Sequence, residues 1–184
     1  MAQREALREL QTRLAQRLAQ AKGEVRVVSW LAVECAGVGL LFPLAGAGEI
    51  FPVDVLLPVP HTQAWFAGVA NLRGGLHSAI DLALFLGLQA LPSPREGASL
   101  VALNPNLGSH SALLVQRLVG LRNAEQLQAQ ASDGVQRPTF AAARWRDATG
   151  RIWQEIDLAA LAKHEQFLAI ASQTQTQHKP IAGH

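Results

Sequence analysis

The sequence predicts a mostly β protein, because short strand-like apolar segments alternate with turn residues through most of its length. The chain has 184 residues, of which 49% are hydrophobic, 5% aromatic and 16% charged. So large an apolar fraction argues against a disordered chain, which buries too little surface to offset its ordering entropy. Short strands with frequent turns are typical of β-barrels and sandwiches. The length fits one domain, or two small ones that share a core.

The N-terminal segment 1–26 is the exception, because residues 3–22 have the pattern of an amphipathic helix. Leucines recur there at gaps of three, four and four residues, and Gly23 follows as a stop signal. The apolar stripe consists of Leu7, Leu10, Leu14 and Leu18. This stripe either docks on the body of the chain or packs on a partner helix, and both interpretations stay open.

The strand-like segments follow Gly23 and are separated by residues that favour turns. Val53, Val55, Leu57 and Val59 alternate with other residues, as in a half-buried strand. The stretch 147–150 has the composition of a hairpin turn. The segments predicted as strands are 25–35, 40–44, 53–59, 100–103, 113–121, 140–145 and 152–156.

A short internal repeat indicates two similar halves. Ile-Asp-Leu-Ala occurs at 80–83 and again at 156–159, each time with a glycine six positions before the isoleucine. Asp81 and Asp157 are each predicted to cap a short helix after a strand. We therefore expect a body over 27–171 whose subdomains are joined near 92–97, where Pro and Gly cluster. The polar residues 172–184 are predicted to form a loose tail.

The charge distribution argues against a basic domain surface, although the pI is near 9.2 with a net charge of +2. Residues 1–26 carry six basic and three acidic groups, so the excess lies in the predicted helix. One alternative remains: a small β-barrel nucleic-acid-binding protein that uses this basic helix. The apolar stretch 27–48 is long enough to span a membrane, but Glu34 and Pro43 interrupt it, which favours a soluble protein.

No catalytic, cofactor-binding or metal-binding pattern is evident. The six histidines lack i,i+3 or i,i+4 spacing, and the single Cys35, which excludes a disulfide framework, lies in an apolar run typical of inert core thiols. One cysteine also fits a reducing, cytoplasmic setting. Asp81 and Asp157 are better explained as helix caps than as a catalytic carboxylate pair.

The segment 65–75 has features of an interaction site. Arg73 precedes the Gly74-Gly75 pair and is the only basic residue between Arg26 and Arg95. Glycine pairs allow tight turns with positive φ. Arg73 either pairs internally with a carboxylate or projects as an anchor for a partner, since arginine is enriched at interface hot spots. The residues alone do not decide between these roles.

The same segment resembles a known family. Val-Ala-Asn-Leu-Arg-Gly at 69–74, followed by Ile-Asp-Leu at 80–82, resembles the core signature of CheW-like coupling domains, the adaptors of bacterial chemosensory arrays. The resemblance extends over about 28–170, and the leading helix with residues 60–66 is most similar to the adaptors of type IV pilus twitching motility. The departures from the family pattern are Gln116, Ser78, Ala79 and the absence of tyrosine.

The resemblance implies a pair of small, five-stranded, SH3-like β-barrels that share a core, with short capping helices. It implies a non-catalytic adaptor without cofactor that couples the cytoplasmic tip of a methyl-accepting chemoreceptor to the regulatory domain of a CheA-type histidine kinase. Such an adaptor is cytoplasmic and recruited to membrane-associated receptor arrays, without inserting into the membrane and without binding nucleic acid.

The resemblance also implies a receptor site on this chain. Five residues match family positions that contact the receptor or shape that surface: Glu49, Gly68, Asn71, Arg73 and Gly74. Glycines would shape the loop, and Arg73 would offer a planar, permanently charged group. The kinase surface is expected on exposed strands and loops and is not assigned to residues.

Overall fold

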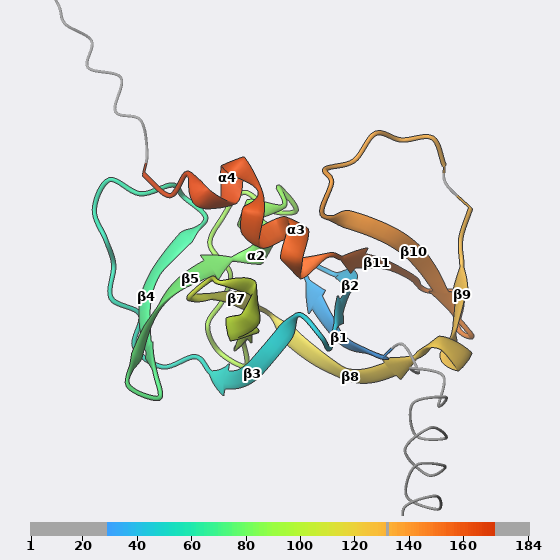
Figure 1. Cartoon of the computed structure of the whole chain (residues 1–184), viewed down its shortest axis with the longest axis horizontal. Coiled ribbons are helices and arrows are strands. Elements are labelled where there is room, and N and C mark those ends of the chain that lie inside the picture. The colour runs from blue at the N-terminus through green and yellow to red at the C-terminus, as the bar shows by residue number, and fades with distance from the viewer. Residues whose placement is uncertain (1–28, 132, 172–184) are drawn as a thin grey trace, which may run out of the picture.

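The computed structural model describes residues 29–131 and 133–171, and these residues form two β-sheets that lie side by side (Figure 1). The predicted helix 3–22 and the tail 172–184 lie outside the described residues. The six-stranded sheet has the order β8-β1-β2-β11-β10-β9, and the five-stranded sheet has the order β3-β6-β7-β5-β4. The mostly β fold class is therefore confirmed.

The elements have the following bounds. The six-stranded sheet consists of β1 (Ser29–Cys35), β2 (Val38–Pro43), β8 (Arg117–Asn123), β9 (Leu127–Ala129), β10 (Ala141–Asp147) and β11 (Ile152–Ile156). The five-stranded sheet consists of β3 (Ala47–Pro52), β4 (Phe66–Leu72), β5 (Gly75–Asp81), β6 (Ser99–Leu103) and β7 (Ser111–Val115). The helices are α2 (Leu82–Phe85), α3 (Leu158–Lys163) and α4 (Glu165–Leu168), with 3-10 turns η1 (Pro105–Leu107) and η2 (Ala124–Gln126).

The chain passes between the two sheets twice. It leaves the six-stranded sheet after β2, builds the whole five-stranded sheet, and returns after β7 to form β8 to β11. The expected connector 92–97 instead lies between α2 and β6, on the five-stranded side. The resemblance implied five strands in each barrel, whereas one sheet has a sixth, β9, whose three residues carry little apolar signal.

Three apolar clusters hold the fold together, and the largest joins the two sheets. It includes Val33 and Phe42 from the six-stranded sheet and Ile80 and Leu113 from the five-stranded sheet. A second cluster packs within the five-stranded sheet, and a third, which includes Trp30, packs within the six-stranded sheet. Strand β1 serves two clusters because alternate side chains point to opposite faces. The apolar character of both faces, predicted from the sequence for 25–35, is thereby explained for Ser29–Cys35.

Two strand predictions differ from the structure. Residues 53–59 form no strand, and only Leu57 makes an isolated bridge, to Val69 of β4. Pro52 and Pro58 lack the amide hydrogen that a ladder requires. The predicted burial phase is also reversed, because Leu56 is buried while the residues beside it are exposed.

The predicted strand 113–121 is two strands in different sheets. The break falls at Gln116, whose side-chain oxygen accepts a 2.6 Å hydrogen bond from the Ala36 amide in the β1–β2 turn. The Gln116 amide nitrogen donates to Gln89 at 2.9 Å. This departure from the family pattern thus fixes the point where the chain crosses between the sheets.

The internal repeat is confirmed as a repeated structural unit. In each copy a β-hairpin, β4–β5 or β10–β11, leads directly into a short helix capped by the aspartate. Asp81 accepts from the Leu84 amide, and Asp157 accepts from the amides of Ala159 and Ala160. No helix among residues 29–131 and 133–171 has the length and apolar character to cross a membrane.

Candidate functional site

The predicted site residues gather around the tip of the β4–β5 hairpin. Leu72 pairs with Gly75, so Arg73 and Gly74 form a two-residue turn with φ values of 51° and 82°. Two positive φ values are the mark of a type I′ turn, whose twist matches that of the flanking strands. The Asn71 side-chain oxygen accepts a 2.9 Å hydrogen bond from the Gly74 amide. Asn71 and Gly74 therefore set the position from which Arg73 projects.

Arg73 forms an ion pair with Glu49 of β3, so the structure brings together two residues that the sequence separates widely. Arg73 Nε lies 2.8 Å from Glu49 Oε2, and the two side chains are 75% and 53% exposed. Exposed pairs contribute only about 0–1 kcal/mol to stability, because water screens them. Of the two roles left open for Arg73, the internal pair is formed, while its exposure leaves the guanidinium accessible to a partner.

The ion pair stands at the edge of an apolar groove of about 280 Å³. Phe51 of β3, Leu72 of β4 and Leu103 of β6 are among the apolar residues that line it. An adjoining hollow of about 270 Å³ shares Phe51 and Leu72 and includes Asn71. Because β3 and β4 are the two edge strands of their sheet, the site is an apolar surface between two strand edges with a charged pair beside it.

His77 also lines this groove, and the sequence analysis did not assign it a role. His77 Nδ1 lies 3.1 Å from the Gly75 carbonyl oxygen, and its ring centroid lies 5.7 Å from that of His110. The two histidines lie far apart in the sequence, and the parallel pairing of β5 with β7 brings them together. Only the sheet register could have revealed this pair.

Gly68 supports the hairpin from a different place and does not line the groove. It lies at a bulge in the β4–β5 pairing and has a φ of 128°. A Cβ atom there would lie 2.5 Å from the Leu57 carbonyl oxygen. The close approach allows Leu57 and Val69 to exchange two backbone hydrogen bonds of 2.9 and 2.8 Å. Gly68 therefore shapes the surface beside β4.

The remaining candidate residues have structural positions. Cys35 is buried, and burial raises the pKa of its thiol to about 12, so the thiolate that nucleophilic chemistry requires is scarce. Asp81 is 2% exposed and accepts hydrogen bonds from the Ser93 amide and hydroxyl at 2.6 and 2.8 Å. Within the described part of the chain, no three potential metal ligands are grouped.

Comparisons with known proteins show the family and the fold of this chain. The family model of the CheW-like domain matches residues 29–166. The protein PilI of Pseudomonas aeruginosa is 27% identical over 165 residues, which cover 86% of this chain and 89% of PilI. The crystal structure of the scaffolding protein TtCheW from Thermoanaerobacter tengcongensis superposes with a TM-score of 0.60 at 14% identity. That superposition covers 72% of this chain and 86% of TtCheW.

Proposed function

Since this chain belongs to the CheW-like domain family, whose members are non-catalytic scaffold proteins, we propose that it couples a methyl-accepting chemoreceptor to a CheA-type histidine kinase. In this role it binds the cytoplasmic tip of the receptor and the regulatory domain of the kinase. It acts in the cytoplasm and is recruited to membrane-associated receptor arrays. The similarity to PilI supports a function in type IV pilus twitching motility.

The observation that carries the proposal is the exposed Arg73–Glu49 pair beside an apolar groove. Arginine is always charged and presents its donors in a planar fork, which suits carboxylate and carbonyl acceptors. Apolar side chains such as Phe51 and Leu72 offer a partner surface to cover. Because breaking an exposed ion pair costs little free energy, Arg73 can exchange Glu49 for an acceptor on the receptor. The site thus suits a reversible contact.

The nucleic-acid-binding alternative has no comparable support. It relies on the basic segment 1–26, which lies outside the described residues. The site described above contains one arginine paired with a glutamate rather than a cluster of cations. Phosphate binding depends on clustered cations.

Arg73→Glu tests the receptor contact. We expect pull-down of a receptor cytoplasmic fragment to fall at least tenfold, about 1.4 kcal/mol, because the variant places two carboxylates together and removes the donor. Arg95→Glu is the matched control, since Arg95 is also exposed but lies in the α2–β6 connection. Arrays multiply weak contacts, so the assay uses the assembled complex of receptor fragment, adaptor and kinase.

Exchanging the charges of Glu49 and Arg73 distinguishes a direct contact of Arg73 with the receptor from an effect of the ion pair on the fold. The double variant Glu49→Arg with Arg73→Glu retains an oppositely charged pair between β3 and the turn. If receptor capture stays low in this variant while its unfolding midpoint is unchanged, Arg73 acts on the receptor directly. Unchanged receptor capture by Arg73→Glu itself would remove the site assignment.

A further inference from the structure

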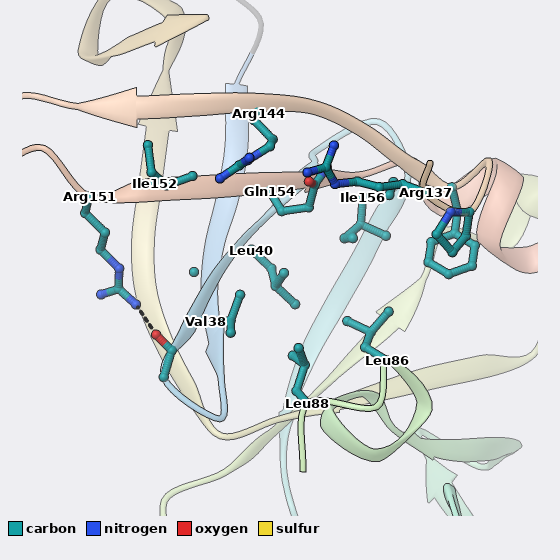
Figure 2. A pocket seen from close by; sticks show the side chains of 15 residues that line it. Val38, Leu40, Leu86, Leu88, Arg137, Arg144, Arg151, Ile152, Gln154 and Ile156 are labelled. Atoms are coloured by element: carbon teal, nitrogen blue, oxygen red, sulfur yellow. Dashed lines mark hydrogen bonds between the residues drawn. The ribbon is translucent and has the colours of Figure 1, made fainter. Parts of the chain in front are cut away.

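A second, larger groove lies on the six-stranded sheet, away from the β4–β5 hairpin. It encloses about 490 Å³ between β2, β10, β11 and the segment that follows α2. We call it the arginine-rimmed groove and define it by Val38, Leu40, Leu86, Leu88, Arg137, Arg144, Arg151 and Ile152. In Figure 2 the apolar side chains of Val38, Leu40, Leu86 and Leu88 lie opposite Arg144 of β10 and Arg151, which directly precedes β11.

The three arginines of the rim are held in place. Arg137 and Arg144 both contact Asp133, with Arg144 Nη1 2.6 Å from Asp133 Oδ2. Arg151 Nη2 donates to Glu34 Oε2 at 2.6 Å and to the Gly37 carbonyl oxygen at 3.2 Å. Side chains fixed in this way lose less conformational entropy when they bind a partner.

The rim has three arginines against the two carboxylates that they contact, Asp133 and Glu34, and both carboxylates stay ionised at neutral pH. Hydrogen bonding from Arg137 holds the pKa of Asp133 well below its usual value, and hydrogen bonds from Arg151 and Arg117 lower that of Glu34. Neither carboxylate is part of the groove lining, which contains three arginines and no acidic residue. The groove therefore combines an apolar floor with a positive rim.

Charge decides which occupant suits this groove. The two ends of the chain are poor candidates, because segment 1–26 has twice as many basic as acidic groups and segment 172–184 has a lysine and no acidic residue. A second copy of the chain, bound symmetrically, would bring its own arginine rim against this one. Like charges brought together at an interface are costly.

We propose that the arginine-rimmed groove binds a segment of another protein in which acidic side chains flank apolar ones. The apolar side chains would cover the exposed Val38 and Leu88, and the carboxylates would meet Arg144 and Arg151. Arginine pairs with carboxylates through two parallel hydrogen bonds, which adds specificity to the apolar contact. This groove shares no lining residue with the one beside Arg73, so the proposal is independent of the proposed receptor contact.

Random-peptide display on the immobilised full-length chain tests the proposal. We expect enriched peptides that combine apolar residues with aspartate or glutamate. A synthetic peptide of the enriched sequence should bind the wild-type chain with an affinity that falls as salt rises. Its affinity should drop at least about tenfold for Arg144→Glu and for Leu88→Asp, which alter the rim and the floor separately.

Two further proteins complete the experiment. Arg122→Glu is the matched control, because Arg122 is, like Arg144, a half-buried arginine of the six-stranded sheet and does not line the groove. Arg144→Gln replaces Arg144→Glu if the charge reversal unfolds the chain, and it should still weaken binding. The proposal fails if no peptide is enriched, if the enriched peptides lack acidic residues, or if Arg122→Glu weakens binding as much as Arg144→Glu.

Discussion

Gly68 and Gly74 both adopt positive φ angles, but only Gly68 is enclosed by neighbouring backbone. A Cβ atom at Gly74 would meet nothing within 4 Å, whereas at Gly68 it would lie 2.5 Å from the Leu57 carbonyl oxygen. Gly74, in the exposed turn, therefore has room for a side chain, whereas Gly68 does not. Gly68 therefore shapes the surface from within, whereas Gly74 lies where a partner can reach it.

Gly68→Ala should destabilise the protein more than Gly74→Ala. Gly74→Ala adds only the backbone strain of a positive φ, about 1–2 kcal/mol, while Gly68→Ala adds a steric clash and should cost about 3 kcal/mol or more. Urea unfolding of both full-length variants measures the difference. Equal losses would show that the close approach of Leu57 relaxes without cost.

The sequence predicted some site residues and missed others, for a physical reason. Arg73, Asn71 and Gly74 are neighbours in the chain, so their turn chemistry is local and readable. An internal pair of Arg73 with a carboxylate was one of two open roles, but Glu49 was not predicted as the partner, because their contact depends on β3 and β4 being the edges of one sheet. His77 was missed because its neighbourhood is set by register alone.

At the scale of elements, the two capped hairpins differ in how deeply their aspartates are buried. Asp81 accepts hydrogen bonds from Leu84 and from both the amide and the hydroxyl of Ser93, inside the protein. Asp157 is exposed and accepts only from amides of its own helix, at Ala159 and Ala160. The same sequence motif thus gives a buried aspartate that joins a helix to the Ser93 segment in one copy, and an exposed helix cap in the other.

Asp81→Ala should cost more stability than Asp157→Ala. Loss of an exposed cap costs about 1 kcal/mol. Loss of Asp81 removes charge-assisted hydrogen bonds and leaves the buried Ser93 amide without its acceptor, so we expect about 3 kcal/mol or more. Chemical denaturation of both variants gives the comparison, and similar losses would mean that Ser93 finds another partner.

The turn of the β10–β11 hairpin contains an aspartate, Asp147, that is held by side-chain hydrogen bonds. Thr149 Oγ1 donates to Asp147 Oδ1 at 2.6 Å, and Trp153 Nε1 donates to Oδ2 at 2.9 Å. These hydrogen bonds lower the pKa of Asp147 from 3.8 to about 2. Because the folded pKa lies below the unfolded one, Asp147 stabilises the fold above about pH 4, and this stabilisation is lost between about pH 4 and pH 2.

Asp147→Asn should therefore lower stability at pH 7 and make little difference near pH 2. The measurement is the thermal unfolding midpoint of both proteins at each pH. Thr149→Ala, which removes the hydroxyl donor, should shift the midpoint in the same direction by a smaller amount. A constant difference between Asp147→Asn and wild type at both pH values would contradict the pKa assignment.

At the scale of the whole molecule, the topology explains which strands the sequence predicted well. Strands with continuous apolar runs, such as β1 and β6, are buried, and their positions followed from composition. The points where the chain crosses between the sheets did not follow from composition. Both crossings, after β2 and at Gln116, occur without a long linker. The Pro-rich connector 92–97 is the conspicuous break in the sequence, yet it joins elements on one side.

Because the chain crosses twice between the two sheets, we expect them to unfold as one cooperative unit. The largest core cluster contains residues of both sheets, so neither sheet can unfold while the other keeps its buried surface. Single domains of up to about 150 residues commonly unfold in one transition, and the described body of this protein spans only 29–171. We expect far-UV circular dichroism and tryptophan fluorescence to report the same urea midpoint.

Two core substitutions test this cooperativity. Leu113 lies in the cluster shared by the sheets, and Leu41 lies in the cluster of the six-stranded sheet alone, and both are fully buried. Leu113→Ala and Leu41→Ala should each cost about 3 kcal/mol and shift both signals together. The fluorescence readout is sensitive to the six-stranded sheet, because Trp30 and Trp153 belong to the same cluster as Leu41. If Leu41→Ala produced an early fluorescence transition while most circular dichroism signal remained, the two sheets would be separate folding units.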